Sequence, residues 1–189
     1  MLTNKTIKLN QMHLRNQILK EHTKENCNTI VEWIGDDVSR FNQLFNLFLN
    51  DEYRVKQRAS WPMSYCVIAH PEFMKNNFDK LIKNLQKPNI HDSIKRNTVR
   101  LLQSIEIPEE NEGTVMQLCF NYVESPTEAV AIKAFSLTIL GNLAKKYPEI
   151  IPEIKLLIQN QMPDQTAAFK VRAKKLLKEF EAIHPFKRI

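Results

Sequence analysis

Apolar residues recur along this chain at intervals that fit one face of an α-helix, and the same face occurs four times. Each copy opens on an apolar residue, and further apolar or small residues follow four, seven, eight and eleven positions later. The opening residues are Val55, Ile94, Ile132 and Phe169, which lie 39, 38 and 37 residues apart. The fourth position after each is small: Ala59, Thr98, Ser136 and Ala173. Four copies of one stripe at near-constant spacing predict an internal repeat.

A second register of apolar residues lies between the copies of the first and predicts a partner helix for each. Its opening residues are Phe41, Phe78, Val115 and Ile154, spaced by 37, 37 and 39 residues. Apolar residues follow three, four and seven positions later, except that Gln161 takes the last of these positions in the fourth copy. The two registers together predict four helix pairs. Their ranges are 37–49 with 51–70, 72–86 with 91–105, 109–123 with 126–146, and 148–161 with 164–182.

Prolines mark the junctions between the predicted helices. Pro71, Pro108 and Pro148 are each followed by glutamate. Proline needs no N–H partner in the first turn of a helix, and a carboxylate there stabilises the positive end of the helix dipole. Pro62 differs because it lies inside a predicted helix, where it removes the hydrogen bond to the Arg58 carbonyl. It therefore predicts a kink.

The segment before the repeats has a weaker pattern. Trp33 and Ile34 belong to a short apolar pattern that predicts a core helix. We therefore expect residues 1–36 to form an N-terminal helical cap and residues 37–189 to form the repeat array, within a single domain overall. We interpret Pro185, near the end of the chain, as the start of a fifth unit.

The second helices carry a further pattern: an acidic residue near the turn, an aliphatic or aromatic residue followed by lysine, and then a small residue. The four copies are Asp51 with Val55, Lys56 and Ala59; Asp92 with Ile94, Lys95 and Thr98; Glu128 with Ile132, Lys133 and Ser136; and Asp164 with Phe169, Lys170 and Ala173. This pattern and its period resemble HEAT repeats, which are close to armadillo repeats, over residues 38–182. The chain departs from that family in using lysine where arginine is frequent and in the variable spacing of the acidic residue.

The resemblance implies an all-α fold: an α-α superhelix, or solenoid, of about four HEAT-like helix pairs with an N-terminal helical cap. HEAT-like proteins serve as scaffolds, transport receptors and lyase accessories, so the resemblance specifies the fold more sharply than the function. From this resemblance we expect a protein partner.

Composition excludes several classes of protein. The chain has only three glycines in 189 residues, whereas phosphate-binding loops and dinucleotide folds need glycine at tight turns. No apolar stretch has the length of a signal peptide or of a membrane span, so we expect a cytoplasmic protein without membrane contact. The three cysteines lack CxxC spacing, and we interpret them as reduced thiols. The net charge of +6 permits an acidic partner without requiring one.

The sequence contains no recognisable catalytic, cofactor-binding or metal-binding motif. Its five histidines are scattered and form no HExxH motif. Cys66 and Cys119 fall in the apolar columns, which indicates inert core thiols. His70 and His184 precede prolines at junctions and are interpreted as polar turn residues. The run from Glu109 to Glu112 is interpreted as the acidic start of a helix.

A basic face is the best candidate for a binding surface. In such solenoids the second helix of each pair lines the concave face, and positions two, six and nine after the opening residue should point away from the core. Lysines beside the stripe add charge, although lysines there can equally form a structural ladder with nearby acidic residues. The candidate partner-binding residues are Arg58, Trp61, Lys95, Arg96, Arg100, Lys133, Arg172 and Lys175.

Two hypotheses for function remain open. In the first, the chain is a non-enzymatic binding or scaffolding module whose basic concave face recruits an acidic protein partner. In the second, it binds nucleic acid, because arginines beside an aromatic side chain can also hold a phosphate backbone. The second hypothesis includes an enzyme, since bacterial DNA alkylation-repair glycosylases are small HEAT-like solenoids with tryptophans and a carboxylate near the lesion. Trp33 lies near Asp36 and Asp37 here, but that family's catalytic motif is not matched.

Overall fold

The computed structural model describes residues 12–183 of the chain, and within that range it consists of helices and connectors without a β-strand. The predicted all-α fold and its four helix pairs are confirmed. The predicted fifth unit at Pro185 and the interpretation of His184 lie outside the described residues. The chain divides into two compact units, residues 1–106 and residues 107–189. The proposed boundary between a cap and an array at residue 36 stays a prediction.

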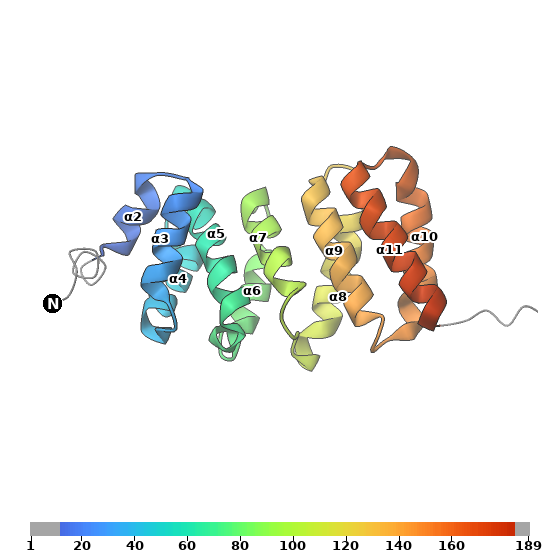
Figure 1. Cartoon of the computed structure of the whole chain (residues 1–189), viewed down its shortest axis with the longest axis horizontal. Coiled ribbons are helices and arrows are strands. Elements are labelled where there is room, and N and C mark those ends of the chain that lie inside the picture. Colours follow the sequence, from blue (N-terminus) through green and yellow to red (C-terminus); the bar gives the residue numbers. More distant parts are fainter. Residues whose placement is uncertain (1–11, 184–189) are drawn as a thin grey trace, which may run out of the picture. The chain divides into compact units, whose positions relative to one another are not determined.

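Unit 1 contains three helix pairs. They are α2 (Leu14–Lys20) with α3 (Lys24–Ile34), α4 (Val38–Asn50) with α5 (Tyr53–Ala69), and α6 (Phe78–Leu85), preceded by the short 3₁₀ helix η1 (Pro71–Met74), with α7 (Asp92–Leu102). The second helices form one layer, in which α5 contacts α3 on one side and α7 on the other. Helices α4 and α6 lie behind α5 and α7 in Figure 1.

Helix α3 follows the same pattern as the predicted second helices, which the sequence comparison of the four copies missed. Its residues Thr23, Cys27, Ile30, Val31 and Ile34 have the same offsets of zero, four, seven, eight and eleven. Three of these side chains are buried, with Cys27 at the small position. The signal was weak because the step from Thr23 to Val55 is only 32 residues, shorter than the other steps. Thus α2 and α3 pair in the manner of the repeats.

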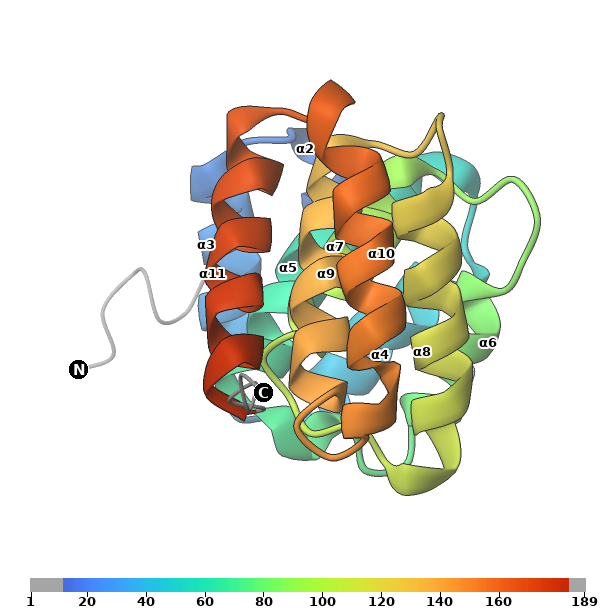
Figure 2. The ribbon, with the colours of Figure 1, turned by 90° about the vertical axis from the view of Figure 1, so that its right-hand side faces the viewer.

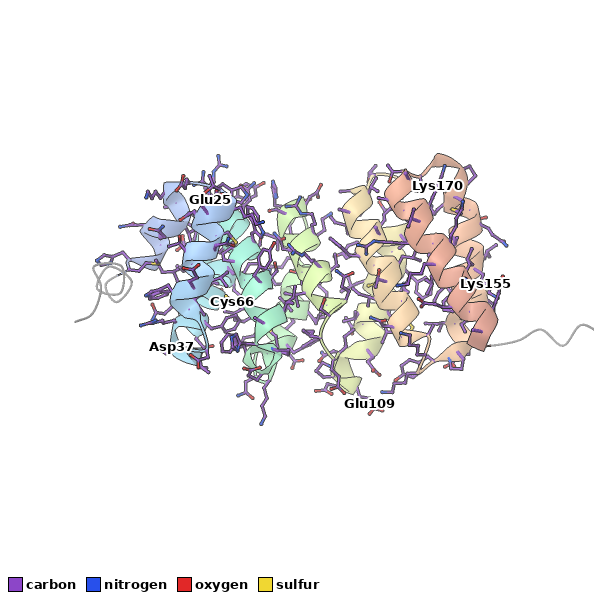
Figure 3. The ribbon with its side chains drawn as sticks, in the orientation of Figure 1. Glu25, Asp37, Cys66, Glu109, Lys155 and Lys170 are labelled. Atoms are coloured by element: carbon purple, nitrogen blue, oxygen red, sulfur yellow. The ribbon has the colours of Figure 1, made fainter. Side chains whose placement is uncertain are left out.

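The turn between α3 and α4 explains how two adjacent pairs join without a long connector. Gly35 has φ of 51°, a left-handed conformation that only glycine adopts without strain, and its N–H donates to the Val31 carbonyl. Two residues later the Asp37 carboxylate accepts hydrogen bonds from the Ser39 and Arg40 N–H groups and so caps α4. Figure 3 labels Asp37 at this turn.

Unit 2 contains two helix pairs. They are α8 (Glu109–Glu124) with α9 (Val130–Leu143), and α10 (Ile151–Gln161) with α11 (Ala167–Ile183); the 3₁₀ helices η2 (Pro148–Ile150) and η3 (Met162–Asp164) precede α10 and α11. Helix α9 packs on α11, and α8 packs on α10, which gives two layers (Figure 2). Glu109, labelled in Figure 3, opens α8 with two further carboxylates in the first turn, as predicted.

Both registers form the core, as the periodicity predicts. Each of the four opening residues of the second helices is at most 4% exposed, and all four small residues four positions later are fully buried. Pro62 is also buried, and α5 continues through it from Tyr53 to Ala69, so the proline does not end the helix. The kink at Pro62 stays a prediction. Trp33 is buried at 6% exposure, which confirms its interpretation as a core residue.

One part of the predicted surface is wrong. Ser64, Ala134 and Gly141 were expected to point away from the core, yet all three are buried. Gly141 shows the reason, because a Cβ atom at this residue would lie 2.4 Å from Cδ1 of Leu176 in α11. A second helix therefore touches a neighbouring second helix as well as its own partner, and it buries more of its circumference than one stripe suggests.

Candidate protein-interaction surface

The candidate residues of unit 1 gather around Trp61 in the middle of α5. The Trp61 side chain is half-buried, and its ring meets the His22 ring edge-on with a centroid separation of 5.3 Å. His22 lies in the connector between α2 and α3. The aromatic pair thus joins α5 to the preceding helix pair and leaves part of the Trp61 ring open to solvent.

Arg58 lies one helical turn before Trp61 and is held by main-chain carbonyls. Its Nη1 atom donates to the Leu19 carbonyl at 2.6 Å, and the Ile18 carbonyl lies 3.4 Å away. These carbonyls belong to the last turn of α2, where the helix dipole attracts a cation. Arg58 therefore fastens α5 to α2 and also brings positive charge to the surface near Trp61.

Arg100 of α7 reaches back to α5 in a similar way. Its guanidinium carbon lies 4.4 Å from the centroid of the Tyr65 ring, in a cation–π contact. The pKa of Tyr65 is lowered, chiefly by the Arg100 guanidinium beside its hydroxyl and next by the Trp61 indole N–H. Tyr65 was absent from the predicted site residues, although it lies four positions after Trp61, on the same side of the helix.

Arg96 and Arg54 are the exposed members of this group. Within residues 12–183, Arg96 makes no hydrogen bond or ion pair, and Arg54 has only a weak contact to Gln57 at 3.4 Å. The charges of both arginines lower the pKa of His22. The largest cause of this lowering is burial, and the charges of Arg58, Arg96 and Arg54 follow in that order. The three guanidinium groups and the imidazole are therefore close enough to share one region of positive potential.

We call this region the arginine patch. It consists of four arginines and three aromatic rings, namely Arg54, Arg58, Arg96, Arg100, His22, Trp61 and Tyr65. None of the four guanidinium groups pairs with a carboxylate in the described part of the chain. Other cations of unit 1 behave differently, because Arg15 pairs with Asp51 at 3.0 Å and Lys95 pairs with Asp92 at 3.2 Å. The four described arginines of unit 1 that have no carboxylate partner therefore lie together, whereas the other two, Arg15 and Arg40, each pair with an aspartate.

The lysine at the edge of each stripe has a structural environment in three of the four copies. Lys95 pairs with Asp92, and Lys170 lies 3.4 Å from the Pro163 carbonyl. Lys133 is only 2% exposed, and its Nζ atom donates to Oε1 of Gln161 at 3.0 Å, while burial lowers its pKa. Lys133 must be corrected from a partner-contacting residue to a buried one. Gln161 departs from the apolar pattern because it serves this lysine.

The two remaining candidates of unit 2 do not form a second patch with unpaired charges. Arg172 lies over the Phe135 ring at 4.9 Å, and its Nη1 atom donates to Thr138 Oγ1 at 3.0 Å and to the Ala134 carbonyl at 3.3 Å. It fastens α11 to α9. The Lys175 side chain is 80% exposed, and Glu179 lies 3.9 Å away, one turn along α11.

Side chains at the third position after the opening residue of a second helix contact the preceding helix pair in three of the four copies. Arg58 and Arg172 occupy this position, and both reach the preceding helix pair. Asn97 occupies it in α7, and its Nδ2 atom donates to Ser60 Oγ of α5 at 2.9 Å, in a buried hydrogen bond. In the sequence this column holds polar residues in three of the four copies, with Phe135 as the exception. The sequence could not show whether that column faces a neighbour or solvent.

Cysteine thiols and metal-ligating side chains are further features of the described residues that bear on chemistry. The three cysteines are buried and unpaired, and burial raises the pKa of Cys27, Cys66 and Cys119 to about 12. Cys66 and Cys119 therefore lie in the core, as predicted, and a raised pKa disfavours the reactive thiolate. Within the described ranges there is no group of three or more histidine, cysteine, aspartate or glutamate side chains that could hold a metal ion. No helix in residues 12–183 is long and apolar enough to cross a membrane.

Comparison with known proteins is consistent with the helix-pair architecture. A model of the HEAT repeat domain family matches residues 14–180, and so begins at the first residue of α2. HEAT repeats generally provide surfaces for protein–protein interaction. A search of curated proteins and a search of solved structures found no significant match.

Proposed function

Because the chain belongs to the HEAT repeat family, we propose that it is a non-enzymatic scaffold whose arginine patch binds an acidic segment of a protein partner. The observation that carries this proposal is the cluster of four arginines around Trp61 that have no carboxylate partner. Like charges that gather without counter-charges repel each other, so the cluster costs stability unless a ligand neutralises it.

The chemistry of the patch suits carboxylates. A guanidinium group offers two parallel N–H donors to a carboxylate, and such pairs are stronger than ordinary hydrogen bonds. Arg96 and Arg54 are exposed and can turn towards a ligand, whereas Arg58 and Arg100 are held in place by Leu19 and Tyr65. The open part of the Trp61 ring provides a flat surface for an apolar side chain between the acidic ones.

The test uses a labelled acidic peptide of alternating glutamate and leucine, with a glutamine-for-glutamate peptide as the neutral control. Fluorescence polarisation at low salt should show binding of the acidic peptide to the wild-type protein. The double variant Arg54→Glu/Arg96→Glu should weaken it at least tenfold, or about 1.4 kcal/mol. The double variant Lys174→Glu/Lys175→Glu makes the same charge change at exposed sites outside the patch and should leave the affinity unchanged. An equal loss in both variants would contradict the proposal.

Binding of nucleic acid is the second candidate, because Trp61 and Tyr65 lie among the arginines as stacking platforms do in single-strand binding proteins. The same assay with labelled single-stranded and duplex oligonucleotides separates the two. A tighter complex with an oligonucleotide than with the acidic peptide, with a steep loss of affinity as salt rises, would favour nucleic acid. Release of a base from an alkylated duplex would be needed to support a glycosylase.

A further inference from the structure

We infer that unit 1 has a second binding surface, a groove lined by side-chain amides between α4 and the start of α6, which takes an uncharged, extended segment of a partner polypeptide. We call it the carboxamide groove. Its amide residues are Asn42, Asn46 and Asn50 of α4 with Asn76 and Asn77 before α6. This inference does not rest on the arginine patch, because the residues are different and lie on first helices.

The groove exists because η1 separates α4 from α6. Phe73 of η1 stacks on Phe41 of α4 with a centroid separation of 4.4 Å, and residues 75–77 then lead into α6. The space left between these elements is a groove of about 520 Å³, a size typical of ligand sites. Phe45 and Phe73 form an apolar floor, and Val38 at the edge is 55% exposed.

The amides are oriented by bonds that leave part of each group available. Asn50 Nδ2 donates to Asn46 Oδ1 at 2.8 Å. Asn77 Nδ2 donates to the Phe73 carbonyl at 3.0 Å and lies 3.4 Å from Asn42 Oδ1. A side-chain amide has two N–H donors and an oxygen with two acceptor positions. In the described structure the amide N–H groups of Asn42 and Asn46 and the oxygens of Asn50 and Asn77 therefore remain free for a ligand.

The spacing of these amides fits a polypeptide in extended conformation. Asn42, Asn46 and Asn50 are four residues apart on one helix, which places successive Cα atoms about 6 Å apart along its axis. An extended chain repeats every two residues, over about 6.7 Å, and every second residue presents its N–H and C=O to the same side. Each asparagine could therefore pair with one such N–H and C=O, because a carboxamide offers the same two groups as a peptide bond.

The charge around the groove is small, because its rim has only one more cation than carboxylates. Its rim has two ammonium groups, Lys75 and Lys80, and one carboxylate, Glu72, which lies 3.1 Å from His70. The five amides between them are neutral. This excess of one positive charge contrasts with the four unpaired arginines of the arginine patch, so an acidic ligand is favoured there and not in the groove. Main-chain recognition together with an apolar floor suits a segment of small apolar and uncharged polar residues.

The test begins with selection of random 12-residue peptides, displayed on phage, against the full-length protein. Selected peptides are then synthesised and their affinities measured by calorimetry. We expect neutral peptides whose affinity falls at least tenfold in the double variant Asn42→Asp/Asn46→Asp, which changes charge but not shape. The double variant Gln159→Glu/Asn160→Asp, at two exposed amides of α10, is the matched control and should have no effect. Circular dichroism confirms that the variants are folded.

A second measurement tests the main-chain recognition itself. N-methylation of alternate residues of a selected peptide should abolish binding in one register and leave it nearly unchanged in the other, because only every second N–H faces α4. Loss of binding in the Arg54→Glu/Arg96→Glu variant would overturn the inference, since the peptides would then occupy the arginine patch. Insensitivity to N-methylation, failure to select neutral peptides, or a reversible dimer that Asn46→Asp dissociates would overturn it as well.

Discussion

The second helices of the two units share one core pattern but differ at their other positions. In unit 1 the sixth position after the opening residue holds Trp61 and Arg100, whereas in unit 2 it holds Thr138 and Lys175. The second position holds Gln57 and Arg96 in unit 1 but Ala134 and Val171 in unit 2. Ala134 is buried, and Val171 is 68% exposed. The repeat thus constrains the residues that pack and leaves the others free to differ.

The same comparison separates two uses of arginine. Arg172 in unit 2 and Arg58 in unit 1 both bond main-chain carbonyls of the preceding helix pair, at 3.3 Å and 2.6 Å. Arg96 has no such bond within the described residues and is exposed. Arginines of the first kind hold neighbouring pairs together, and only those of the second kind are free to reorient towards a partner. A count of basic residues treats both kinds alike.

The largest effect should come from truncation of the core in either unit. Phe48 in α4 and Phe169 in α11 are both fully buried. Phe48→Ala and Phe169→Ala should each lower the free energy of unfolding by about 3–5 kcal/mol, because each leaves a cavity. Urea denaturation measures the loss, and hydrogen exchange should locate the faster-exchanging amides in the unit that carries the change. Similar protection losses in both units after each substitution would show that the units do not unfold separately.

A carboxylate in unit 2 provides a smaller, pH-dependent effect. Glu112 at the start of α8 accepts hydrogen bonds from Lys146 Nζ at 2.8 Å and from Tyr147 Oη at 2.5 Å. The hydrogen bond from Lys146, and next the one from Tyr147, lowers the pKa of Glu112 below its usual value of 4.5. A carboxylate whose pKa is lower in the folded protein than in the unfolded chain stabilises the fold at pH values above the unfolded-state pKa. This stabilisation is lost as the pH falls through the folded-state pKa.

Glu112→Gln should therefore destabilise the protein at pH 7 and much less in acid. The difference in unfolding free energy between wild type and variant should shrink as pH falls below about 4.5, the usual value for glutamate. Thermal unfolding from pH 3 to pH 7 measures this. Glu110→Gln on the same turn is the control, because it makes the same chemical change at an exposed side chain. A constant difference for Glu112→Gln would contradict the assignment.

The distinction between the two kinds of arginine can be measured with three parallel substitutions. Arg58→Gln and Arg172→Gln should each lower the free energy of unfolding by about 1–2 kcal/mol, because each removes bonds to the preceding helix pair. Arg96→Gln should change it by less than about 0.5 kcal/mol, as is usual for an exposed side chain. Equal losses in all three would mean that Arg96 is a structural residue too.

Substitutions of two glycines should have small effects of opposite sign. Gly113 lies inside α8 with open space around its Cα, so Gly113→Ala should stabilise unit 2 by about 0.5–1 kcal/mol. Gly35 ends α3 with φ of 51°, so Gly35→Ala should destabilise unit 1 by about 1 kcal/mol. Thermal unfolding of both variants checks the signs, and a gain at Gly35 would contradict the left-handed turn.

Much of the fold could be predicted from periodicity because burial imposes it. The helix pairs from α4 to α11 follow the two apolar registers, although α6 begins at Phe78, six residues after the predicted start. Pro71 and Pro148 begin η1 and η2, and Pro108 directly precedes α8. The pair formed by α2 and α3 was only anticipated as a cap, since α2 has seven residues and too few apolar positions to show the repeat.

The site was less predictable than the fold. The residues Trp61, Arg96 and Arg100 were selected from their positions, and the structure brings them into one group on unit 1. His22 and Tyr65 were missed, because their part in the group depends on which neighbouring helix they meet. Lys133 was included although it is buried, because a lysine beside an apolar stripe has the same sequence signature whether it is covered or solvated.

The order of apolar residues alone specified an all-helical repeat, its period and most of its core, because a helix must place its apolar side chains on one face to bury them. The packing of one helix pair on the next decided which arginines hold carbonyls and which remain unpaired, and it opened the groove beside Phe73. Such contacts join residues some 35 to 40 positions apart, and their geometry depends on the angle and separation of whole helices, which no local pattern of residues encodes.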